Sequence, residues 1–295
     1  MKGFNLDYLA TFRSVIELGS FSAAAERHGL TQPAVSLQVR QLEKRLGARL
    51  VERVGRIART TMAGSQLLEH ADRIEAAVSA AVEAVAQHGA GTPGRVRLGT
   101  GATACIFLLP PLLARLRQQL PGLEITVSTG NTGDMLKAIE ENLMDIGLVT
   151  LPASGRSLET VPVLRDDFLL IAPEGMTLPD RISSENIAKL PLLLFEPGGN
   201  TRRIVDKWFA SGGAVPEPVM SLGSVEAIKA MVEAGVGCSI VPGMSVNENT
   251  RRRLATRPLS PPLFRELAVV IRRDKKLSPG LRATREALLG LAGRT

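Results

Sequence analysis

The helix predicted for residues 32–46 has a first turn and one face that are rich in hydrogen-bonding side chains. Val35, Val39, Leu42 and Leu46 form its apolar stripe and are expected to be core. On the opposite face, glutamine can bond adenine, arginine can bond guanine, and an exposed leucine can contact a thymine methyl. A merely solvated helix face would have the same composition. The residues with this chemistry, or beside it, are Thr31, Gln32, Pro33, Ser36, Leu37, Arg40 and Lys44.

Two shorter helices are predicted to position this one. Apolar residues at three- and four-residue spacing favour a first helix that ends at Gly19. Ser22 is expected to cap a second helix over residues 23–28, which Gly29 ends. Thr31 is a suitable N-cap for the third. Two helices joined by a glycine-containing turn form a helix-turn-helix, which presents the start of its second helix to the major groove.

A basic hairpin is predicted directly after these helices. Residues 49–61 contain two strand-like pieces around Gly55. We expect this hairpin to act as a wing on the phosphate backbone or in the minor groove, although any charged hairpin would show the same pattern. Residues 1–61 hold ten Lys and Arg against five acidic residues, a density that attracts a polyanion. The arginines predicted for the wing are Arg53, Arg56 and Arg59, of which Arg53 and Arg56 are assigned to DNA.

A long helix is predicted from Met62 to about Gln87, capped by Thr61. Apolar residues along it step by 4, 3, 4, 3 and 4, which is the spacing of a coiled-coil seam. This face could pack on its own chain, but a narrow seam on a polar helix favours pairing with a second copy. Residues 62–88 are therefore assigned to a dimerisation helix and 89–94 to a glycine-rich hinge. The predicted seam is Leu67, Ala71, Ile74, Val78, Ala81 and Val85.

The remainder, residues 95–295, alternates strand-like and helical runs. This pattern predicts open, mostly parallel sheets in two lobes with a cleft between them. We expect the final strand and helix to return to the first lobe. The first lobe is assigned to about 95–164 plus 265–295, and the second to about 165–264. The overall fold class is α/β, with an all-α winged helix-turn-helix domain over residues 1–61.

Polar and small residues recur where predicted strands give way to helices in both lobes. Ligands of open α/β sheets bind at the carboxyl ends of strands, and helix starts favour anions. Each residue taken singly is equally explained as a helix cap. Arg202 or Arg203 could pair with a carboxylate, whereas Glu196 nearby disfavours an anion, so the charge of the ligand stays open. The predicted ligand site comprises Gly101, Ala102, Thr103, Asn131, Thr132, Thr150, Gly199, Asn200, Thr201, Arg202 and Ser224.

The run FSAAAERHGLTQPAVSLQVRQLEKRLGARLVERVGRIARTTMAG, Phe21 to Gly64, closely resembles the N-terminal domain of LysR-type transcriptional regulators. Thr60 departs mildly from the leucine that is usual in the family. The resemblance implies that residues 32–46 are the recognition helix, that the wing carries Arg53 and Arg56, and that residues 62–88 dimerise. It extends more loosely over nearly the whole chain. There it implies a fold similar to periplasmic solute-binding proteins, with a small effector between the lobes.

These expectations describe a regulator that is controlled by a small-molecule effector, expected to be an organic anion, bound between the two lobes. Its other expected partners are double-stranded DNA, further copies of itself as a homodimer or homotetramer, and RNA polymerase. We expect a cytoplasmic location, because Asp7 and Arg13 interrupt the apolar N-terminus and no long apolar run appears. We expect no cofactor and no metal, because the three histidines and two cysteines have no ligand spacing.

Three other functions were weighed against this prediction. An α/β enzyme lacks support, since no G-x-S-x-G elbow, phosphate-binding lysine loop or complete dinucleotide motif occurs, and catalytic residues are predicted to be absent. A solute-binding protein would need an export signal and no basic N-terminal domain. A redox-sensing regulator would use Cys105 and Cys238, which are assigned to different lobes.

Overall fold

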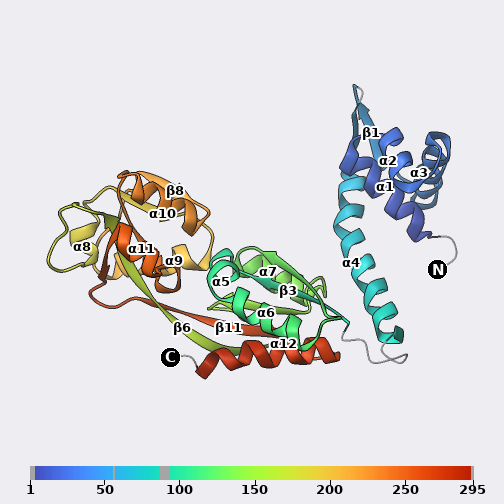
Figure 1. Cartoon of the computed structure of the whole chain (residues 1–295). Helices are drawn as coiled ribbons and strands as arrows, with labels where there is room; N and C mark the ends of the chain where they lie inside the picture. Colours follow the sequence, from blue (N-terminus) through green and yellow to red (C-terminus); the bar gives the residue numbers. More distant parts are fainter. Residues whose placement is uncertain (1–3, 56, 87–93, 294–295) are drawn as a thin grey trace. The chain divides into compact units, whose positions relative to one another are not determined.

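The computed structural model of the chain describes residues 4–55, 57–86 and 94–293. The chain divides into two compact units, Met1–Val82 and Glu83–Thr295 (Figure 1). Arg56 and most of the predicted hinge at 89–94 lie outside the described residues.

The first unit is a winged helix-turn-helix. Side-chain caps start its first three helices: Asn5 accepts from the Asp7 amide, Ser20 from Ala23 and Thr31 from Ala34. The predicted cap Ser22 is wrong, because the second helix begins two residues earlier and Ser20 takes that role. The elements are α1 (Leu6–Leu18), α2 (Phe21–His28), α3 (Gln32–Leu46), β1 (Val51–Val54), β2 (Ile57–Thr60) and α4 (Met62–Ala86).

The core of this unit contains Phe12, Val35, Val39 and Leu42, all almost fully buried. Leu46, which was also expected in the core, is 42% exposed. It is the last residue of α3, directly before Gly47, whose φ of 68° turns the chain away from the helix. The stripe of α3 therefore ends one helical turn earlier than its periodicity predicted.

The N-terminal half of α4 belongs to the same core. Ala71 is buried there, and Leu67 and Ile74 pack against the cluster. Arg13 on α1 adds ion pairs to Asp72 and Glu75 of α4. Half of the predicted dimer seam therefore packs against its own chain. The spacing in the sequence leaves this possibility open for the whole seam.

The apolar surface of α4 lies further along the helix. Val78 is 40% exposed and Val82 is 63% exposed, and Ala81 between them is also exposed. Val85 belongs to the same helix, but its side chain is outside the described part. Val82 was absent from the predicted seam.

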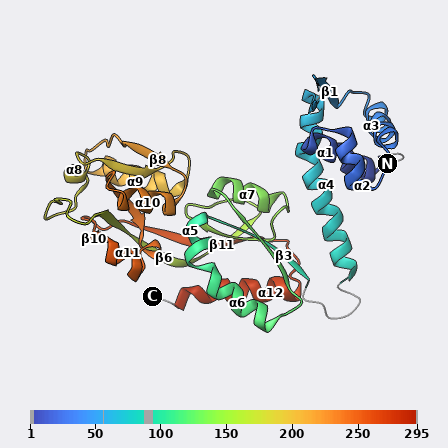
Figure 2. The same ribbon diagram turned by 45° about the horizontal axis from the view of Figure 1, so that its top comes forward.

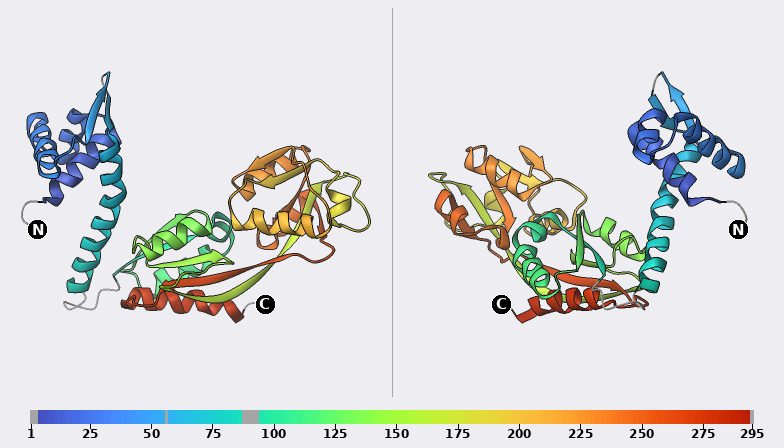
Figure 3. Two further views of the ribbon diagram at one scale, coloured as in Figure 1. Left: turned by 180° about the vertical axis from the view of Figure 1, so that it is seen from behind. Right: turned by 45° about the vertical axis from the view of Figure 1, so that its right-hand side comes forward.

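The second unit contains two lobes of mixed α/β structure. Figure 2 and Figure 3 show helices arranged around a twisted sheet in each lobe. Its elements are β3 (Arg95–Thr100), α5 (Ala102–Phe107), α6 (Leu109–Gln119), β4 (Glu124–Thr129), α7 (Thr132–Glu140), β5 (Ile146–Thr150), β6 (Leu158–Pro173), α8 (Ser184–Ile187), β7 (Leu192–Phe195), α9 (Asn200–Ser211), β8 (Met220–Leu222), α10 (Val225–Glu233), β9 (Cys238–Pro242), η1 (Gly243–Ser245), α11 (Glu248–Arg253), β10 (Leu254–Pro258), β11 (Phe264–Arg272), α12 (Pro279–Leu289) and η2 (Gly290–Gly293).

Two long strands connect the lobes. The strand order is β4-β3-β5-β11-β6-β9-β7-β8, with β10 paired to β6. The first part of β6 pairs with β11 in the first lobe, and its second part pairs with β9 and β10 in the second. β6 and β11 are antiparallel to their neighbours, so the sheets are mixed rather than mostly parallel. As predicted, β11 and α12 return to the first lobe, where Leu281 and Leu288 join its core (Figure 3).

A buried ion cluster ties the first lobe together at the start of β5. The Asp145 carboxylate accepts hydrogen bonds from Arg97, at 2.8 Å from the backbone amide and 2.8 Å from Nη2, and from Lys275 Nζ at 2.7 Å. Burial alone would raise the pKa of Asp145, but the hydrogen bonds from Arg97 and Lys275 outweigh it and hold the pKa below its ordinary 3.8.

We expect Asp145→Asn to lower the free energy of unfolding by about 3 kcal/mol at neutral pH, because two half-buried cations, Arg97 and Lys275, lose their charged partner. Because the pKa of Asp145 is lower in the folded state, its contribution to the free energy of unfolding is complete above pH 3.8. That contribution is lost as the pH falls through the folded-state pKa. Urea unfolding at neutral pH and at about pH 3 should therefore show the gap between parent and variant narrowing in acid. Asp274→Asn, at an exposed residue, is the control. The account would be contradicted if parent and variant had the same free energy of unfolding at neutral pH, or if the difference between them grew in acid.

Candidate functional site

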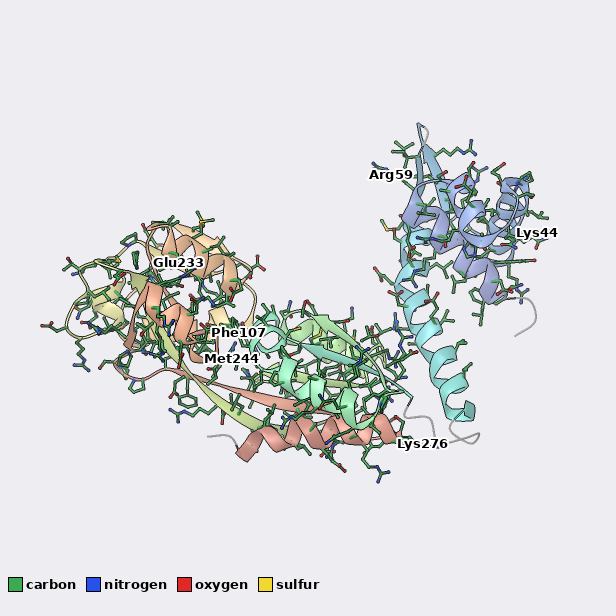
Figure 4. All side chains as sticks on the ribbon, viewed as in Figure 1. Lys44, Arg59, Phe107, Glu233, Met244 and Lys276 are labelled. Atoms are coloured by element: carbon green, nitrogen blue, oxygen red, sulfur yellow. The ribbon has the colours of Figure 1, made fainter. Side chains whose placement is uncertain are left out.

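The outward face of α3 is open and polar. Thr31, Leu37, Arg40 and Lys44 are exposed, Leu37 by 54%, as is Pro33. Figure 4 shows Lys44 at the surface of the first unit. The exposed Leu37 side chain is available to contact a thymine methyl.

The remaining predicted residues of α3 hold one another in place. Gln32 Nε2 donates to Ser36 Oγ at 2.7 Å, and both residues are half-buried. Arg40 Nε donates weakly to the Ser36 carbonyl at 3.3 Å. These local bonds restrict the side chains that face outward. Arg40 itself is exposed on this face of the helix, where its other N–H groups can reach a partner outside the chain.

The hairpin of β1 and β2 forms the predicted wing. Arg53 and Arg59 are exposed on it, and Figure 4 labels Arg59 there. The Arg53 guanidinium lies 5.8 Å from the centre of the Phe21 ring. Glu43 on α3 fixes the start of the wing, because its Oε1 accepts the amides of Leu50, at 2.8 Å, and Val51, at 3.2 Å. The sequence did not predict this link between helix and wing, because hydrophobic periodicity does not show which backbone amides a half-buried glutamate will bond.

A cavity of about 470 Å³ lies between the two lobes of the second unit. Every predicted ligand-site residue except Ser224 lines it, and the neighbours of Ser224, Gly223 and Val225, do line it. The structure thus brings together residues that are up to 101 positions apart in the sequence. The lining residues from the prediction are Gly101, Ala102, Thr103, Asn131, Thr132, Thr150, Gly199, Asn200, Thr201 and Arg202.

Hydrogen bonds to one strand end connect the lobes across this cavity. The Thr150 carbonyl, at the end of β5, accepts from Thr132 Oγ1 at 2.9 Å and from Asn200 Nδ2 at 2.7 Å. Asn200 also donates to the Pro152 carbonyl at 3.0 Å. Because Asn200 belongs to the second lobe and its acceptors to the first, its amide fastens the two lobes at the cleft.

The helices that start at the cavity differ in their caps. Asn131 caps α7 by accepting the Asp134 amide at 3.0 Å, and it also lines the cavity. The N-caps of α5, α9 and α10 are Gly101, Gly199 and Ser224, and none of them makes a side-chain cap bond. Free N–H groups at a helix start carry partial positive charge, which suits an anionic ligand.

Hydroxyl and charged groups complete the lining. Thr103 is 8% exposed, and its hydroxyl has no hydrogen-bond partner within the described part of the chain. Arg202 pairs with Asp206 of its own helix at 2.8 Å, and Arg203 Nη2 donates to Asn200 Oδ1. Both arginines are therefore engaged within the chain, as ordinary helix-start residues are.

An arginine that the sequence did not single out lies in the cavity wall. Arg265 on β11 lines the cavity and is only 4% exposed. Its Nε donates to Asp166 Oδ2 at 2.9 Å, and its Nη1 donates to Thr201 Oγ1 at 3.1 Å. Burial lowers the pKa of the Arg265 guanidinium, and Asp166 opposes that effect. Strand pairing could have suggested the ion pair, because Arg265 and Asp166 face each other in register.

The junction between the lobes is closed by exchanged contacts. Phe107, at the end of α5, packs against the core of the second lobe, and Met244 in η1 packs against the core of the first (Figure 4). Lys229 Nζ lies 4.8 Å from the centre of the Phe107 ring. Each lobe thus inserts an apolar side chain into the other beside the cavity.

The two cysteines lie in different lobes and differ in burial. Cys105 is half-buried in α5, while Cys238 is buried in β9, where desolvation raises the pKa of its thiol to about 11. A thiol held in its neutral form is a poor redox sensor.

Within residues 4–55, 57–86 and 94–293, no cluster of metal-ligating side chains occurs. No helix in these residues is long and apolar enough to span a membrane.

Both units match known sequence families. Residues 6–65 match the bacterial regulatory helix-turn-helix proteins of the lysR family, and residues 89–292 match the LysR substrate binding domain. The chain belongs to the LysR family of transcription regulators. It is thus a DNA-binding regulator with an effector-binding domain, in agreement with the resemblance of residues 21–64.

Relatives of the same length support the assignment to the LysR family. The chain is 32% identical to the HTH-type transcriptional regulator CbbR of Rhodospirillum rubrum, covering 99% of this chain and 97% of that protein. It is 32% identical to the HTH-type transcriptional activator CmpR of Synechocystis sp., covering 94% and 92%.

Solved structures show the same fold. The crystal structure of CbnR, a LysR family regulator, has a TM-score of 0.80 at 21% identity and covers 98% of this chain and 99% of that one. CbnR in complex with its target DNA has a TM-score of 0.79 at 21% identity, covering 98% and 100%.

Proposed function

We propose that this LysR-type regulator reads its operator with the exposed face of α3 and holds the phosphate backbone with its wing. The proposal is supported by the solvent-facing Leu37, Arg40 and Lys44 and by the exposed arginines of the hairpin. Arg56 is assigned to the same wing, although it lies outside the described residues. Base contacts supply sequence preference, and wing contacts supply salt-dependent affinity.

The regulator acts as a dimer that pairs through α4. Val78 and Val82 support this, because these two exposed valines are four residues apart and therefore lie on one face of the helix, in a segment that is rich in alanine. The predicted seam of Leu67, Ala71 and Ile74 contributes indirectly by anchoring α4 to the helix-turn-helix. Assembly into a tetramer and contact with RNA polymerase remain part of the proposal, as does a cytoplasmic location.

An organic anion that binds between the lobes controls this regulator. The observation that carries the proposal is the cavity itself, whose walls include helix starts of both lobes without side-chain caps and the hydroxyl-bearing Thr103. We infer a sensor and not an enzyme, because the relatives are named as transcriptional regulators. A ligand shifts the regulator only if it binds one arrangement of the lobes better than another.

The effector proposal predicts a specific effect of Thr103→Val. We expect it to weaken binding of any cleft ligand about tenfold or more, because a hydrogen bond to a charged group contributes roughly 1.5–3 kcal/mol. A thermal-shift screen of metabolites against the full-length protein identifies the ligand, and calorimetry then compares parent and variant.

Thr126→Val, at an exposed threonine of β4, is the matched control and should bind as the parent does. If the ligand binds the Thr103 variant as tightly as the parent, its site is not this cavity.

A further inference from the structure

The guanidinium of Arg265 is a buried cation with one nitrogen left unused. Two of its nitrogens bond Asp166 and Thr201, but Nη2 has no hydrogen-bond partner among the residues that the structure describes. Buried donors are almost always bonded, and an unbonded donor on an ion is especially costly. Arg265 lines the cavity, and its unbonded N–H group is therefore available to an acceptor that the described residues do not provide.

The neighbouring contacts explain why Asp166 does not take this donor. Arginine and aspartate commonly pair through two parallel bonds. Here Asp166 Oδ2 accepts from Arg265 Nε, while Asp166 Oδ1 accepts the backbone amide of Met244 at 2.9 Å. The second carboxylate oxygen of Asp166 therefore bonds η1, and Asp166 accepts one hydrogen bond from Arg265 and not two. The arrangement orients the guanidinium and keeps Nη2 free.

The surroundings of Arg265 specify the chemistry of its acceptor. Thr201, which accepts from Nη1, is the second residue of α9, whose start lacks a side-chain cap. Free backbone N–H groups and a guanidinium N–H group thus adjoin one another in the wall of the cavity. Both are donors, and both favour an anionic oxygen.

The acidic residues of the cavity orient the ligand. Asp134 and Glu196 also line it, but both are exposed. An anionic group would be repelled by them and attracted toward Arg265, which is buried. A ligand with one anionic end and one neutral or donor-bearing end matches this distribution better than a ligand with anionic groups at both ends.

We propose that Arg265 is the residue that recognises the anionic group of the effector, through Nη2, with the ligand being a small molecule that carries a carboxylate or phosphate at one end. The inference rests on the proposed function of the cavity and adds to it the residue and the ligand class. Arg265, on the connecting strand β11, bonds Asp166 of the other connecting strand and Thr201 of the second lobe. A ligand bound to this arginine would therefore favour one arrangement of the two lobes over another.

The test uses the full-length protein and two probes of different shape, selenate as a tetrahedral oxyanion and acetate as a planar carboxylate. We expect at least one of them to bind at millimolar concentration, and selenium anomalous scattering or refined acetate density to place an oxygen within hydrogen-bond distance of Nη2. The probe that binds more tightly indicates whether the effector carries a phosphate-like group or a carboxylate.

Arg265→Lys keeps the positive charge beside Asp166 but cannot reproduce the fork of the guanidinium. We expect it to weaken binding of the probe at least tenfold while the thermal unfolding temperature stays close to that of the parent. Arg165→Lys is the matched control, because Arg165 is on the paired strand β6, is exposed and pairs with Asp167 outside the cavity. It should leave probe binding unchanged.

Three results would overturn the inference: no binding of either probe, binding at a location away from Arg265, or equal affinity for the parent and the Arg265 variant. Should a metabolite found by thermal shift still alter DNA binding in that case, the proposed function survives and only the role of Arg265 fails. If no ligand alters DNA binding while selenate or acetate binds at Arg265, the proposed function fails and the anion site stands.

Discussion

Replacing Arg40 with alanine is expected to remove about 1–3 kcal/mol of discrimination between the operator and random DNA, which is the contribution of a base contact made by two hydrogen bonds. Arg40 is exposed on the outward face of α3, and its Nε donates weakly to the Ser36 carbonyl. Its other guanidinium nitrogens make no hydrogen bond to the residues that the structure describes, so they could bond a guanine edge.

Arg53→Ala on the wing provides the contrast. Because Arg53 is expected to contact the backbone, its loss should weaken binding to operator and random duplexes alike and reduce the dependence on salt. Both variants would be titrated with operator and random DNA at several salt concentrations. If Arg40→Ala leaves the ratio of the two affinities unchanged, the outward face of α3 does not read bases.

Replacing Val78 and Val82 together with aspartate is expected to separate the dimer. The two side chains are exposed in the single chain and would be buried against a second copy, where unpaired carboxylates cost several kcal/mol per interface. We expect light scattering to show a lower mass, and operator affinity to fall because two half-sites are no longer bound together.

The double threonine variant at the same positions keeps the shape of valine without a charge, and it should retain more of the association. Ile74, although it belongs to the predicted seam, is unsuitable for this test, because it packs in the core of the first unit and its loss would unfold that unit. A double aspartate variant with the mass and operator affinity of the parent would exclude α4 as the pairing surface.

The sequence predicted the main elements because local signals mark them. Gly19, Gly29 and Gly47 end the first three helices in the left-handed conformation that glycine favours, and Thr31 caps α3 as expected. Alternating strands and helices predicted the two-lobed unit. Ten of the eleven residues predicted for the ligand site line the cavity, because carboxyl ends of neighbouring strands meet at one edge, but Arg265, Asp134 and other lining residues were not predicted.

What the sequence could not reveal depends on long-range contacts. Seam spacing does not distinguish a partner chain from the chain's own core, so Ala71 was assigned to the dimer although it is buried beside α1. Arg265 was missed because it starts an apolar strand, and only the pairing of β11 with β6 places it beside Asp166 and the cavity. The sequence also did not predict that the connecting strands are antiparallel to their neighbours. The order of strands and helices along the chain does not determine the direction in which two strands pair.

The most direct measurement is a genome-wide footprint of the DNA bound by this regulator, repeated with each metabolite that binds the full-length protein. The account predicts discrete operators with two protected half-sites, and a change in their occupancy or spacing when the ligand is present, because the dimer must fit the helical repeat of DNA. Binding without sequence preference, or operators whose protection is the same with and without every bound ligand, would contradict it.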